Sequence, residues 1–158
     1  MPTPAISVAI TTPQVHPLGA NASSSENVQA SDVDFLALLA AYRPSGGIAR
    51  EGEIAARVLG ADPSQLTRQI SERSVLSFEW QGESWLPVFQ FEPTTPTVKP
   101  SIQILVNELS GTLGCLELAN WFVQPNTWLD DVAPLPMMQR QFARVHDAAR
   151  AMHYARCV

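Results

Sequence analysis

The sequence lacks an apolar run long enough to cross a membrane as a helix, which takes about 20 residues. Its first residues also lack the basic start of a secretory signal. We therefore expect a cytoplasmic protein that does not bind or span a membrane.

Cysteine and histidine are scarce. The two cysteines, Cys115 and Cys157, form no CxxC pair, and His16, His146 and His153 stand far apart in the chain. Structural metal sites need closely spaced pairs of such ligands. The sequence therefore predicts two reduced thiols, no metal site and no cofactor.

Catalytic motifs are missing as well. No serine stands in a G-x-S-x-G turn, and the glycines at 46–47 and 111–114 lack the rest of a phosphate-binding loop. His146 and Asp147 are neighbours on a predicted helix, so their side chains point in different directions. We therefore expect a protein that is not an enzyme.

Positive charge is limited and unevenly placed. The chain has 10 Lys and Arg against 15 Asp and Glu, a net charge of −5, which is not typical of a nucleic-acid-binding protein. Residues 140–158 nevertheless contain Arg140, Arg144, Arg150 and Arg156 against Asp147 alone. The C-terminal end of the chain is therefore basic.

Residues 1–30 contain four prolines and a run of three serines but almost no charge. This composition is typical of a disordered leader. A short strand over residues 6–10 is the alternative interpretation.

Three helices are predicted after the leader, over residues 31–42, 50–59 and 62–73. Ser31 or Asp32 suits the N-cap of the first, and Asp62 followed by Pro63 suits the start of the third. Gly60 provides a stop between the second and the third. This spacing is typical of a helix-turn-helix unit.

The periodicity changes over residues 75–92, where apolar and polar side chains alternate before the turn at residues 81–83. This pattern predicts a β-hairpin, whose second strand is an edge strand or carries a bulge because Pro87 interrupts it. A hairpin directly after a helix-turn-helix is the arrangement of a winged helix. The aromatic side chains of the hairpin either pack in the core or stack on bases; they are Trp80, Trp85, Phe89 and Phe91.

The second half of the chain is predicted to be helical. Residues 93–100 are rich in proline and threonine and suit a linker. Helices are expected over residues 100–109, 116–124, 134–138 and 140–154, with a free tail at 155–158. The predicted fold class is mainly α with a β-hairpin, in which a helix-turn-helix or winged-helix-like half, residues 31–92, precedes a helical domain, residues 93–158.

The third predicted helix carries the candidates for DNA binding, which are Gln65, Thr67, Arg68 and Arg73. Arg pairs with guanine and Gln with adenine in the major groove. The alternative is a helical scaffold for protein contacts, because the local excess of positive charge is weak for a surface that faces phosphates.

An aromatic motif surrounds two turns in the second half. Residues 85–91 read Trp-Leu-Pro-Val-Phe-Gln-Phe, and residues 119–129 read Ala-Asn-Trp-Phe-Val-Gln-Pro-Asn-Thr-Trp-Leu. Pro134 and an apolar Met pair follow, and then a helix with small residues over 145–150. Over residues 74–158 the chain resembles the toxin-binding domain of Xre/MbcA/ParS-type antitoxins. That family usually has glycines between the Leu and the Pro, where this chain has Asp130, Asp131, Val132 and Ala133.

The resemblance implies an antitoxin that binds a RES-type toxin, which degrades NAD, and blocks its active site. It also implies repression of the antitoxin's own operon and a homodimer. Pro134 would help to shape the domain, and the basic C-terminal end would enter the pocket for the anionic dinucleotide. The toxin-binding candidates are Trp121, Asn126, Trp128, Leu129, Arg150, Tyr154, Arg156 and Val158 with its carboxylate.

Two other functions stay open. One is a stand-alone winged-helix transcription regulator, which specific DNA binding without a neighbouring toxin gene would favour. The other is an orphan protein-interaction module whose toxin has been lost or replaced. A RES-type toxin in the neighbouring reading frame would favour the antitoxin over both.

Overall fold

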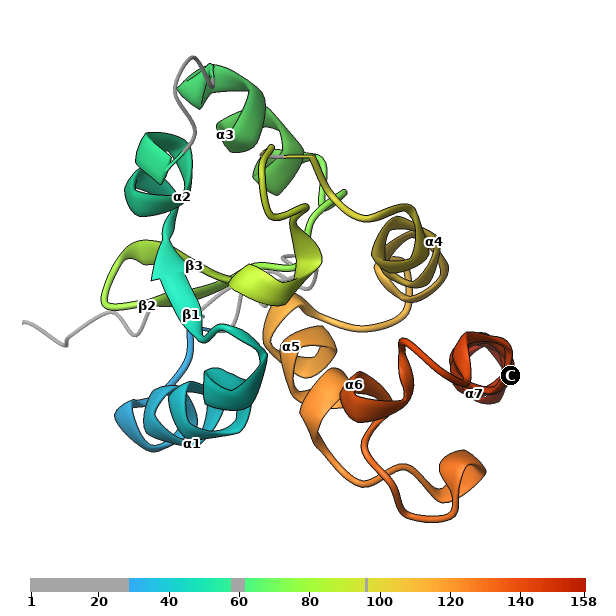
Figure 1. Cartoon of the computed structure of the whole chain (residues 1–158). Coiled ribbons are helices and arrows are strands. Elements are labelled where there is room, and N and C mark those ends of the chain that lie inside the picture. The colour runs from blue at the N-terminus through green and yellow to red at the C-terminus, as the bar shows by residue number, and fades with distance from the viewer. Residues whose placement is uncertain (1–28, 58–61, 96) are drawn as a thin grey trace, which may run out of the picture.

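The computed structural model describes residues 29–57, 62–95 and 97–158. Across these residues the chain forms seven α-helices and three short strands, so the fold is mainly helical with one small antiparallel sheet, as predicted (Figure 1). None of the helices in these ranges is long and apolar enough to cross a membrane. Residues 1–28 of the predicted leader, with the alternative strand, and the end of the second predicted helix at 58–59 lie outside the described residues. The leader was predicted through residue 30, but Ala30 is buried and its N–H donates a hydrogen bond to the Glu79 carbonyl at 2.7 Å, so this end of the leader belongs to the fold.

Helix α1 (Asp32–Tyr42) begins where the sequence predicts. The Ser31 hydroxyl accepts a hydrogen bond from the Asp34 N–H at 3.2 Å, and the Asp34 carboxylate accepts one from the Ser31 N–H at 3.1 Å. This reciprocal cap satisfies two N–H groups that the helix start leaves without partners. A 3₁₀ turn over Arg43–Ser45 follows and ends at Gly46, whose φ of 105° favours glycine.

The next three elements are strand β1 (Ile48–Arg50), helix α2 (Glu51–Arg57) and helix α3 (Pro63–Ser71). The Asp62 carboxylate caps α3 by accepting a hydrogen bond from the Ser64 N–H at 3.0 Å. The sequence did not predict β1. Three residues are too few for an alternating pattern to identify a strand.

The predicted hairpin is formed by β2 (Phe78–Trp80) and β3 (Glu83–Pro87). Its turn residues Gln81 and Gly82 both have positive φ, 50° and 76°, as the tightest hairpins require. β1 pairs with the other side of β3, so the strand order is β1-β3-β2 and β3 is the central strand. Helices α2 and α3 pack on each other, whereas α1 packs on α5 and lies on the other side of the sheet (Figure 1).

The predicted edge strand or bulge at Pro87 is therefore wrong. Pro87 is the last residue of the central strand and lies opposite Ile48. The chain then enters a 3₁₀ turn over Val88–Gln90. Because the strand ends at Pro87, the missing N–H interrupts no hydrogen bond in the middle of the sheet.

The second half continues with four helices and a 3₁₀ turn. Before them, residues 90–92 lie beside residues 97–99, since the Glu92 N–H donates to the Thr97 carbonyl at 2.9 Å and the Lys99 N–H to the Gln90 carbonyl at 2.8 Å. The elements that follow are α4 (Pro100–Leu109), α5 (Cys115–Val123), the 3₁₀ turn η3 (Thr127–Leu129), α6 (Pro134–Met137) and α7 (Phe142–Cys157).

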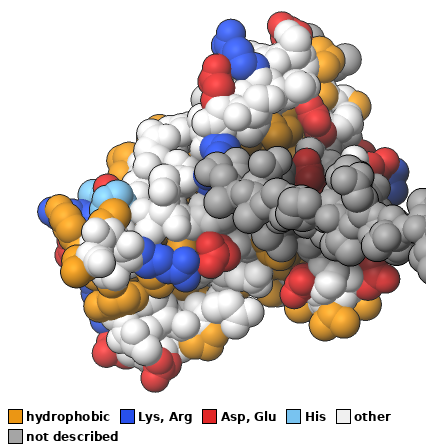
Figure 2. Space-filling view, turned by 180° about the vertical axis from the view of Figure 1, so that it is seen from behind, with side chains coloured by type: hydrophobic (Ala, Val, Ile, Leu, Met, Phe, Trp, Pro, Cys, Tyr) orange, Lys and Arg blue, Asp and Glu red, His pale blue; other side chains and the backbone are white. Residues whose placement is uncertain are grey.

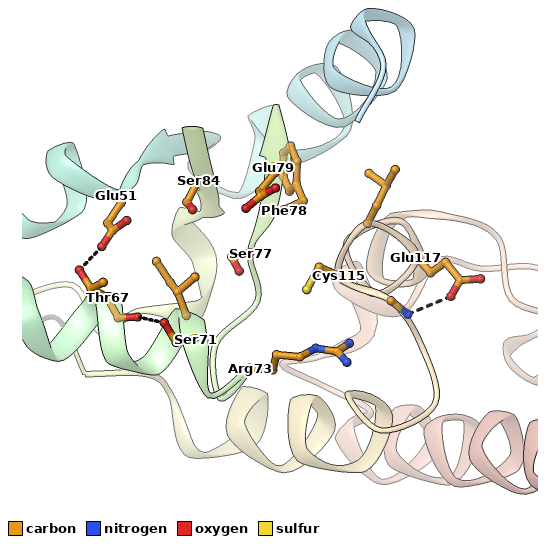
Figure 3. Close-up of a pocket in the computed structure, with 13 residues that line it drawn as sticks. Glu51, Thr67, Ser71, Arg73, Ser77, Phe78, Glu79, Ser84, Cys115 and Glu117 are labelled. Carbon is orange, nitrogen blue, oxygen red and sulfur yellow. Dashed lines mark hydrogen bonds between the residues drawn. The ribbon is translucent and has the colours of Figure 1, made fainter. Parts of the chain in front are cut away.

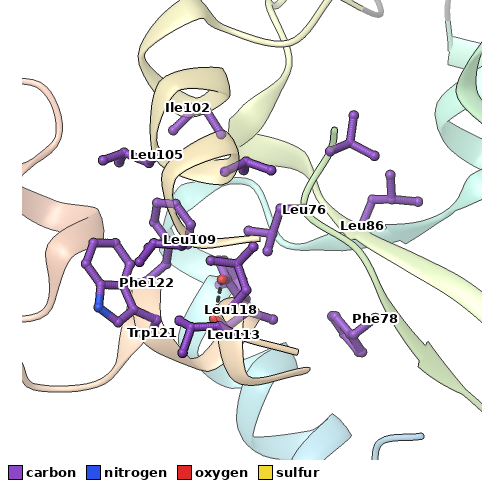
Figure 4. Packing of buried hydrophobic residues seen from close by; sticks show 14 of the residues in the cluster. Leu76, Phe78, Leu86, Ile102, Leu105, Leu109, Leu113, Leu118, Trp121 and Phe122 are labelled. Carbon is purple, nitrogen blue, oxygen red and sulfur yellow. Dashed lines mark hydrogen bonds between the residues drawn. The ribbon is translucent and has the colours of Figure 1, made fainter. Parts of the chain in front are cut away.

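One hydrophobic core includes side chains from both halves of the chain. α5 lies at its centre, with α1 on one side and α4, α6 and α7 on the other (Figure 1). The Tyr42 hydroxyl donates a hydrogen bond to the Ala119 carbonyl at 2.6 Å and so joins α1 to α5. Figure 4 shows aliphatic residues of α4 near the aromatic residues of α5, with Leu86 and Phe78 of the hairpin further along the same core.

The hairpin aromatics pack against this core, which confirms the core-packing interpretation. Phe35 of α1 stacks on Trp80 with ring centroids 3.9 Å apart and meets Trp85 edge-on. Phe89 lies between Tyr42 and Phe122. These contacts attach α1 and α5 to the sheet region.

Candidate protein-binding site

Helix α5 places two aromatic side chains just before the turn that the motif predicts. The Glu117 carboxylate accepts a hydrogen bond from the Gly114 N–H at 2.9 Å and so caps the helix start. That bond and the neighbouring Arg156 lower the pKa of Glu117, with partial burial acting in the opposite direction. At the other end, Trp121 and Phe122 are buried and meet edge-on, with ring centroids 5.2 Å apart.

The turn after α5 is organised by the buried residue Asn126. Its side-chain oxygen accepts a hydrogen bond from the Trp128 N–H at 3.0 Å and so caps η3. Its backbone carbonyl accepts from the Leu129 N–H at 2.9 Å and from the Asp131 N–H at 3.0 Å, and its N–H donates to the Val132 carbonyl at 3.3 Å. This loop, residues 126–132, is therefore a closed unit, with Leu129 buried beneath it.

Asp130 and Asp131 have φ values of 57° and 60°, in the left-handed region. Most side chains are strained in this conformation, glycine is not, and Asp tolerates it better than most. The Asp130 carboxylate also lies 2.7 Å from Arg144 Nη2 of α7, and both side chains are largely exposed. This exposed pair adds about 0–1 kcal/mol at most.

We predict that Asp131→Val lowers the free energy of unfolding by about 1–2 kcal/mol, because a β-branched side chain is strained at positive φ. Asp131→Gly should change it by less than about 0.5 kcal/mol, because relief of strain offsets the greater freedom of glycine in the unfolded chain. Urea denaturation measures both. Asp147→Val, at an exposed helical position of α7, is the matched control. Equal stability of the Asp131→Val variant and the parent would contradict the left-handed loop.

Helix α7 packs on α4 and η3 through buried Val145, Ala148 and Ala149. The predicted free tail at residues 155–158 is wrong, because α7 continues through Cys157. Arg156 Nη1 donates to the Glu117 carboxylate at 3.1 Å, which ties the last turn of α7 to the start of α5.

The predicted toxin-binding residues separate into two groups. Trp121, Asn126 and Leu129 are buried and shape the loop region. The exposed group presents basic and aromatic side chains, and it comprises Trp128, Arg150, Tyr154, Arg156 and Val158. This second group is the part of the candidate site that a partner can reach.

A shallow groove of about 310 Å³ lies between α5 and the end of α7. Asn120, Gln124 and Arg156 provide polar walls, and Met152 an apolar one. Trp121 lines the groove, and its buried indole N–H has no hydrogen-bond partner among the described residues. Buried donors usually have a partner, so this side of α5 is unusual.

The DNA-binding candidates on α3 do not form a basic surface. Gln65, Thr67 and Arg68 are exposed, but Thr67 donates a hydrogen bond to the Glu51 carboxylate and Arg68 lies 3.8 Å from Glu72. Arg73 turns inward and donates to the Leu113 carbonyl.

Beside α3 lies a groove of about 700 Å³, which Figure 3 shows in close-up. Its charged lining residues are the acids Glu51, Glu79 and Glu117 and a single base, Arg73. Figure 2 shows basic side chains scattered among acidic ones over the described part of one face. Such a surface repels phosphate more than it attracts it.

Two polar residues that the sequence did not single out have structural roles. His153 Nδ1 lies 3.0 Å from the Glu108 carbonyl oxygen and 3.1 Å from Thr112 Oγ1, so it joins α7 to the end of α4. Gln90 is fully buried and hydrogen-bonded to Leu76 and Pro87. The position of Gln90 between Phe89 and Phe91 was the one feature of the sequence that could have indicated its structural role. Nothing in the sequence indicated the role of His153.

No group of three or more His, Cys, Asp or Glu that could hold a metal occurs within residues 29–57, 62–95 and 97–158. Cys115 and Cys157 are free thiols, half-buried and exposed respectively. The candidate site consists of exposed aromatic and basic side chains on the loop at residues 126–132 and on α7. No protein-family model, curated protein or solved structure matches the chain.

Proposed function

We propose that this chain is an antitoxin that binds and neutralises a RES-type, NAD-degrading toxin through the loop at residues 126–132 and the outer end of α7. The exposed basic and aromatic end of α7 carries this proposal. Arg150, Tyr154 and Val158 are exposed there, together with Arg156. Aromatic and Arg side chains dominate the energetics of many protein interfaces.

The backbone of the loop supports the resemblance at the place where the sequences differ. Antitoxins of this family usually have glycines between the Leu and the Pro. This chain has Asp130 and Asp131 there, both in the left-handed conformation that glycine adopts without strain. The same loop geometry is therefore compatible with either residue type.

The charge of α7 favours an acidic surface on the partner. A pocket that binds the negatively charged pyrophosphate of NAD is itself positively charged, so the basic end of α7 fits an acidic surface of the toxin better than the dinucleotide pocket. Helix α7 presents Arg150 and Arg156 at its exposed end, with no acidic residue after Asp147. Complementary charge increases the rate and specificity of such an association.

DNA binding is a second candidate function, because two consecutive helices, α2 and α3, precede the β2–β3 hairpin. Gln65 and Arg68 are exposed on α3 and are the proposed base-reading residues. Repression of the chain's own operon would use this surface while α7 holds the toxin. The acidic residues around α3 make protein binding the better-supported function.

The test begins with the reading frame beside the gene, where we expect a RES-type toxin. The full chain should inhibit NAD loss by the purified toxin. The double variant Arg150→Glu, Tyr154→Ala should require at least about tenfold more protein for the same inhibition, since it removes two interface anchors. Arg68→Glu is the matched charge reversal on α3.

The variants on α3 and on α7 should have opposite effects on toxin inhibition and on operator binding. Arg68→Glu should keep toxin inhibition and weaken binding to an operator probe, and the α7 double variant should do the reverse. Unchanged inhibition by a folded α7 variant would overturn the assignment of α7. Failure of the full chain to bind the toxin would overturn the antitoxin proposal, and specific operator binding alone would favour a transcription regulator.

A further inference from the structure

After its first turn, which contains Asp32 and Asp34, helix α1 is apolar on every side. After Asp34, residues 35–41 read Phe-Leu-Ala-Leu-Leu-Ala-Ala. Phe35 and Leu38 face the core, while Val33 and Leu36 are 76% and 62% exposed on the opposite face. Three exposed alanines continue that face, and they are Ala37, Ala40 and Ala41.

A surface helix normally has one apolar face and one polar face. Here the outer face of α1, defined by Val33, Leu36, Ala37, Ala40 and Ala41, is apolar and exposed. Figure 2 shows apolar side chains flanked by acidic ones at the end of the molecule where α1 lies. A contiguous exposed apolar patch of this kind marks an interaction surface.

We propose that the outer face of α1 binds the same face of a second copy of this chain, with the two helices antiparallel about a two-fold axis. Such an interface is self-complementary, because each helix presents the same patch to the other. The proposal does not depend on a toxin partner. It identifies an interaction surface separate from the α7 site.

The side chains of the face suit a close helix pair. Ala37, Ala40 and Ala41 are small, so the helix backbones can approach closely, near the lower end of the 8–10 Å usual between packed helices. Val33 and Leu36 lie towards the N-terminal end and would cover the alanines of the other copy. An antiparallel pair also places the positive end of each helix dipole beside the negative end of the other.

Charged residues at the two ends of α1 favour the antiparallel orientation. Asp32 and Arg43 are separated by 43 − 32 = 11 positions, which is about three turns, so they lie on the same flank of the helix. In the antiparallel pair, the two-fold axis passes between the helices and is perpendicular to them. This axis leaves the flank with Asp32 and Arg43 on the same side of the pair in both copies, and it exchanges the N-terminal and C-terminal ends. Asp32 of one copy therefore lies beside Arg43 of the other, twice in the dimer.

The two residues are available for this pairing. Asp32 Oδ1 accepts a hydrogen bond from Trp80 Nε1 at 2.9 Å, which orients the carboxylate and leaves Oδ2 without a partner among the described residues. Arg43 is exposed and makes no salt bridge in the described part of the chain. In a parallel pair, by contrast, the two-fold axis runs along the helices and exchanges the flanks. The two Asp32 side chains then lie on opposite sides of the pair at one end, the two Arg43 side chains do so at the other end, and no Asp32 lies beside an Arg43.

The length of α1 limits the affinity that we expect for the dimer. Its 11 residues span about 16 Å at 1.5 Å per residue, so a pair formed by this helix alone lies at the small end of specific interfaces. We therefore expect a dimer with a Kd in the micromolar range. Sedimentation of the full chain from about 1 μM to about 300 μM should show a monomer–dimer transition.

A charge in the middle of the face should abolish that transition. Ala40→Glu should weaken dimerisation at least about 100-fold, because it places two carboxylates in the apolar contact. Ile104→Glu, at a 45% exposed apolar position of α4, is the matched control and should leave the dimer intact. Circular dichroism of both variants checks that they fold.

A charge exchange tests the orientation. Arg43→Asp alone should weaken the dimer, and adding Asp32→Arg should restore it, because the exchanged pair meets only in the antiparallel arrangement. A chain that stays monomeric up to the highest concentration, a dimer that survives Ala40→Glu, or no restoration in the double exchange would overturn the proposal. If only a chain without residues 1–28 dimerises, that segment rather than a second copy occupies the face, which also overturns it.

Discussion

Replacing Gln90 by leucine should lower the free energy of unfolding by about 4 kcal/mol, one of the two largest effects that we expect in this protein. Leucine keeps the approximate volume of the side chain and removes its hydrogen bonds. Each buried polar group left without a partner costs about 1–3 kcal/mol. Urea denaturation, followed by tryptophan fluorescence, measures the loss.

The large loss is expected because the Gln90 amide makes hydrogen bonds to buried backbone groups. Its Nε2 donates to the Leu76 carbonyl at 2.8 Å and to the Pro87 carbonyl at 3.0 Å, and its Oε1 accepts from the Leu76 N–H at 2.8 Å. Both Gln90 and Leu76 are fully buried, so water cannot take over these bonds. The side chain therefore acts as a neighbouring strand would, satisfying the backbone just before β2.

Gln103 provides the matched control for this substitution. Its Nε2 donates to the Ser74 carbonyl at 2.8 Å, but the side chain is only half-buried. Gln103→Leu should therefore cost less than about 1 kcal/mol, since water can solvate the released carbonyl. If both variants lost the same stability, the cost would not arise from burial of the Gln90 hydrogen bonds.

Local signals were sufficient to predict most helices. Ser31 and Asp62 cap the helices that the sequence assigns to them, and their side chains make the expected hydrogen bonds. The apolar face of α4, with Leu105 and Val106 among its members, is the face that the structure buries. These features depend on neighbours within one or two turns, which the sequence records directly.

Features that depend on distant partners were not predictable in the same way. β1 is a strand because β3 lies beside it, and Pro87 ends a central strand because β1 covers the other edge of β3. The Tyr42–Ala119 hydrogen bond joins residues 77 positions apart. The last turn of α7 forms against α5 through Arg156 and Glu117, where the sequence predicted a free tail.

In the candidate site too, the sequence predicts local features but not those that depend on distant partners. The sequence predicts the turn that starts at Asn126, because Pro125 ends the helix before it. It does not distinguish the aromatic side chains that support the turn from those that a partner can reach. Trp121 and Phe122 are buried, whereas Trp128 is 45% exposed. The packing of α5 against α1, α6 and β2, and of η3 against α7, decides this.

The second large prediction compares a buried aromatic side chain, Phe122, with an exposed one, Trp128. Phe122→Ala should lower the free energy of unfolding by about 3–5 kcal/mol, because it leaves a cavity among Phe89, Trp121 and the aliphatic core. Trp128→Ala should lower it by less than about 1.5 kcal/mol, since the Trp128 side chain is already 45% exposed. Alanine also keeps the backbone N–H that donates to Asn126 Oδ1. Thermal and urea unfolding of both variants compare the two losses.

Toxin binding should respond in the opposite order. At a temperature where both variants are folded, Trp128→Ala should weaken binding of the toxin at least about tenfold, as expected for an exposed aromatic anchor. Phe122→Ala should bind nearly as the parent does, because Phe122 lies beneath the surface and acts through the fold. Equal binding by the Trp128→Ala variant and the parent would remove the loop from the toxin interface and leave α7 as the sole contact. A large loss of stability in the same variant would instead place Trp128 with the supporting residues, next to Trp121.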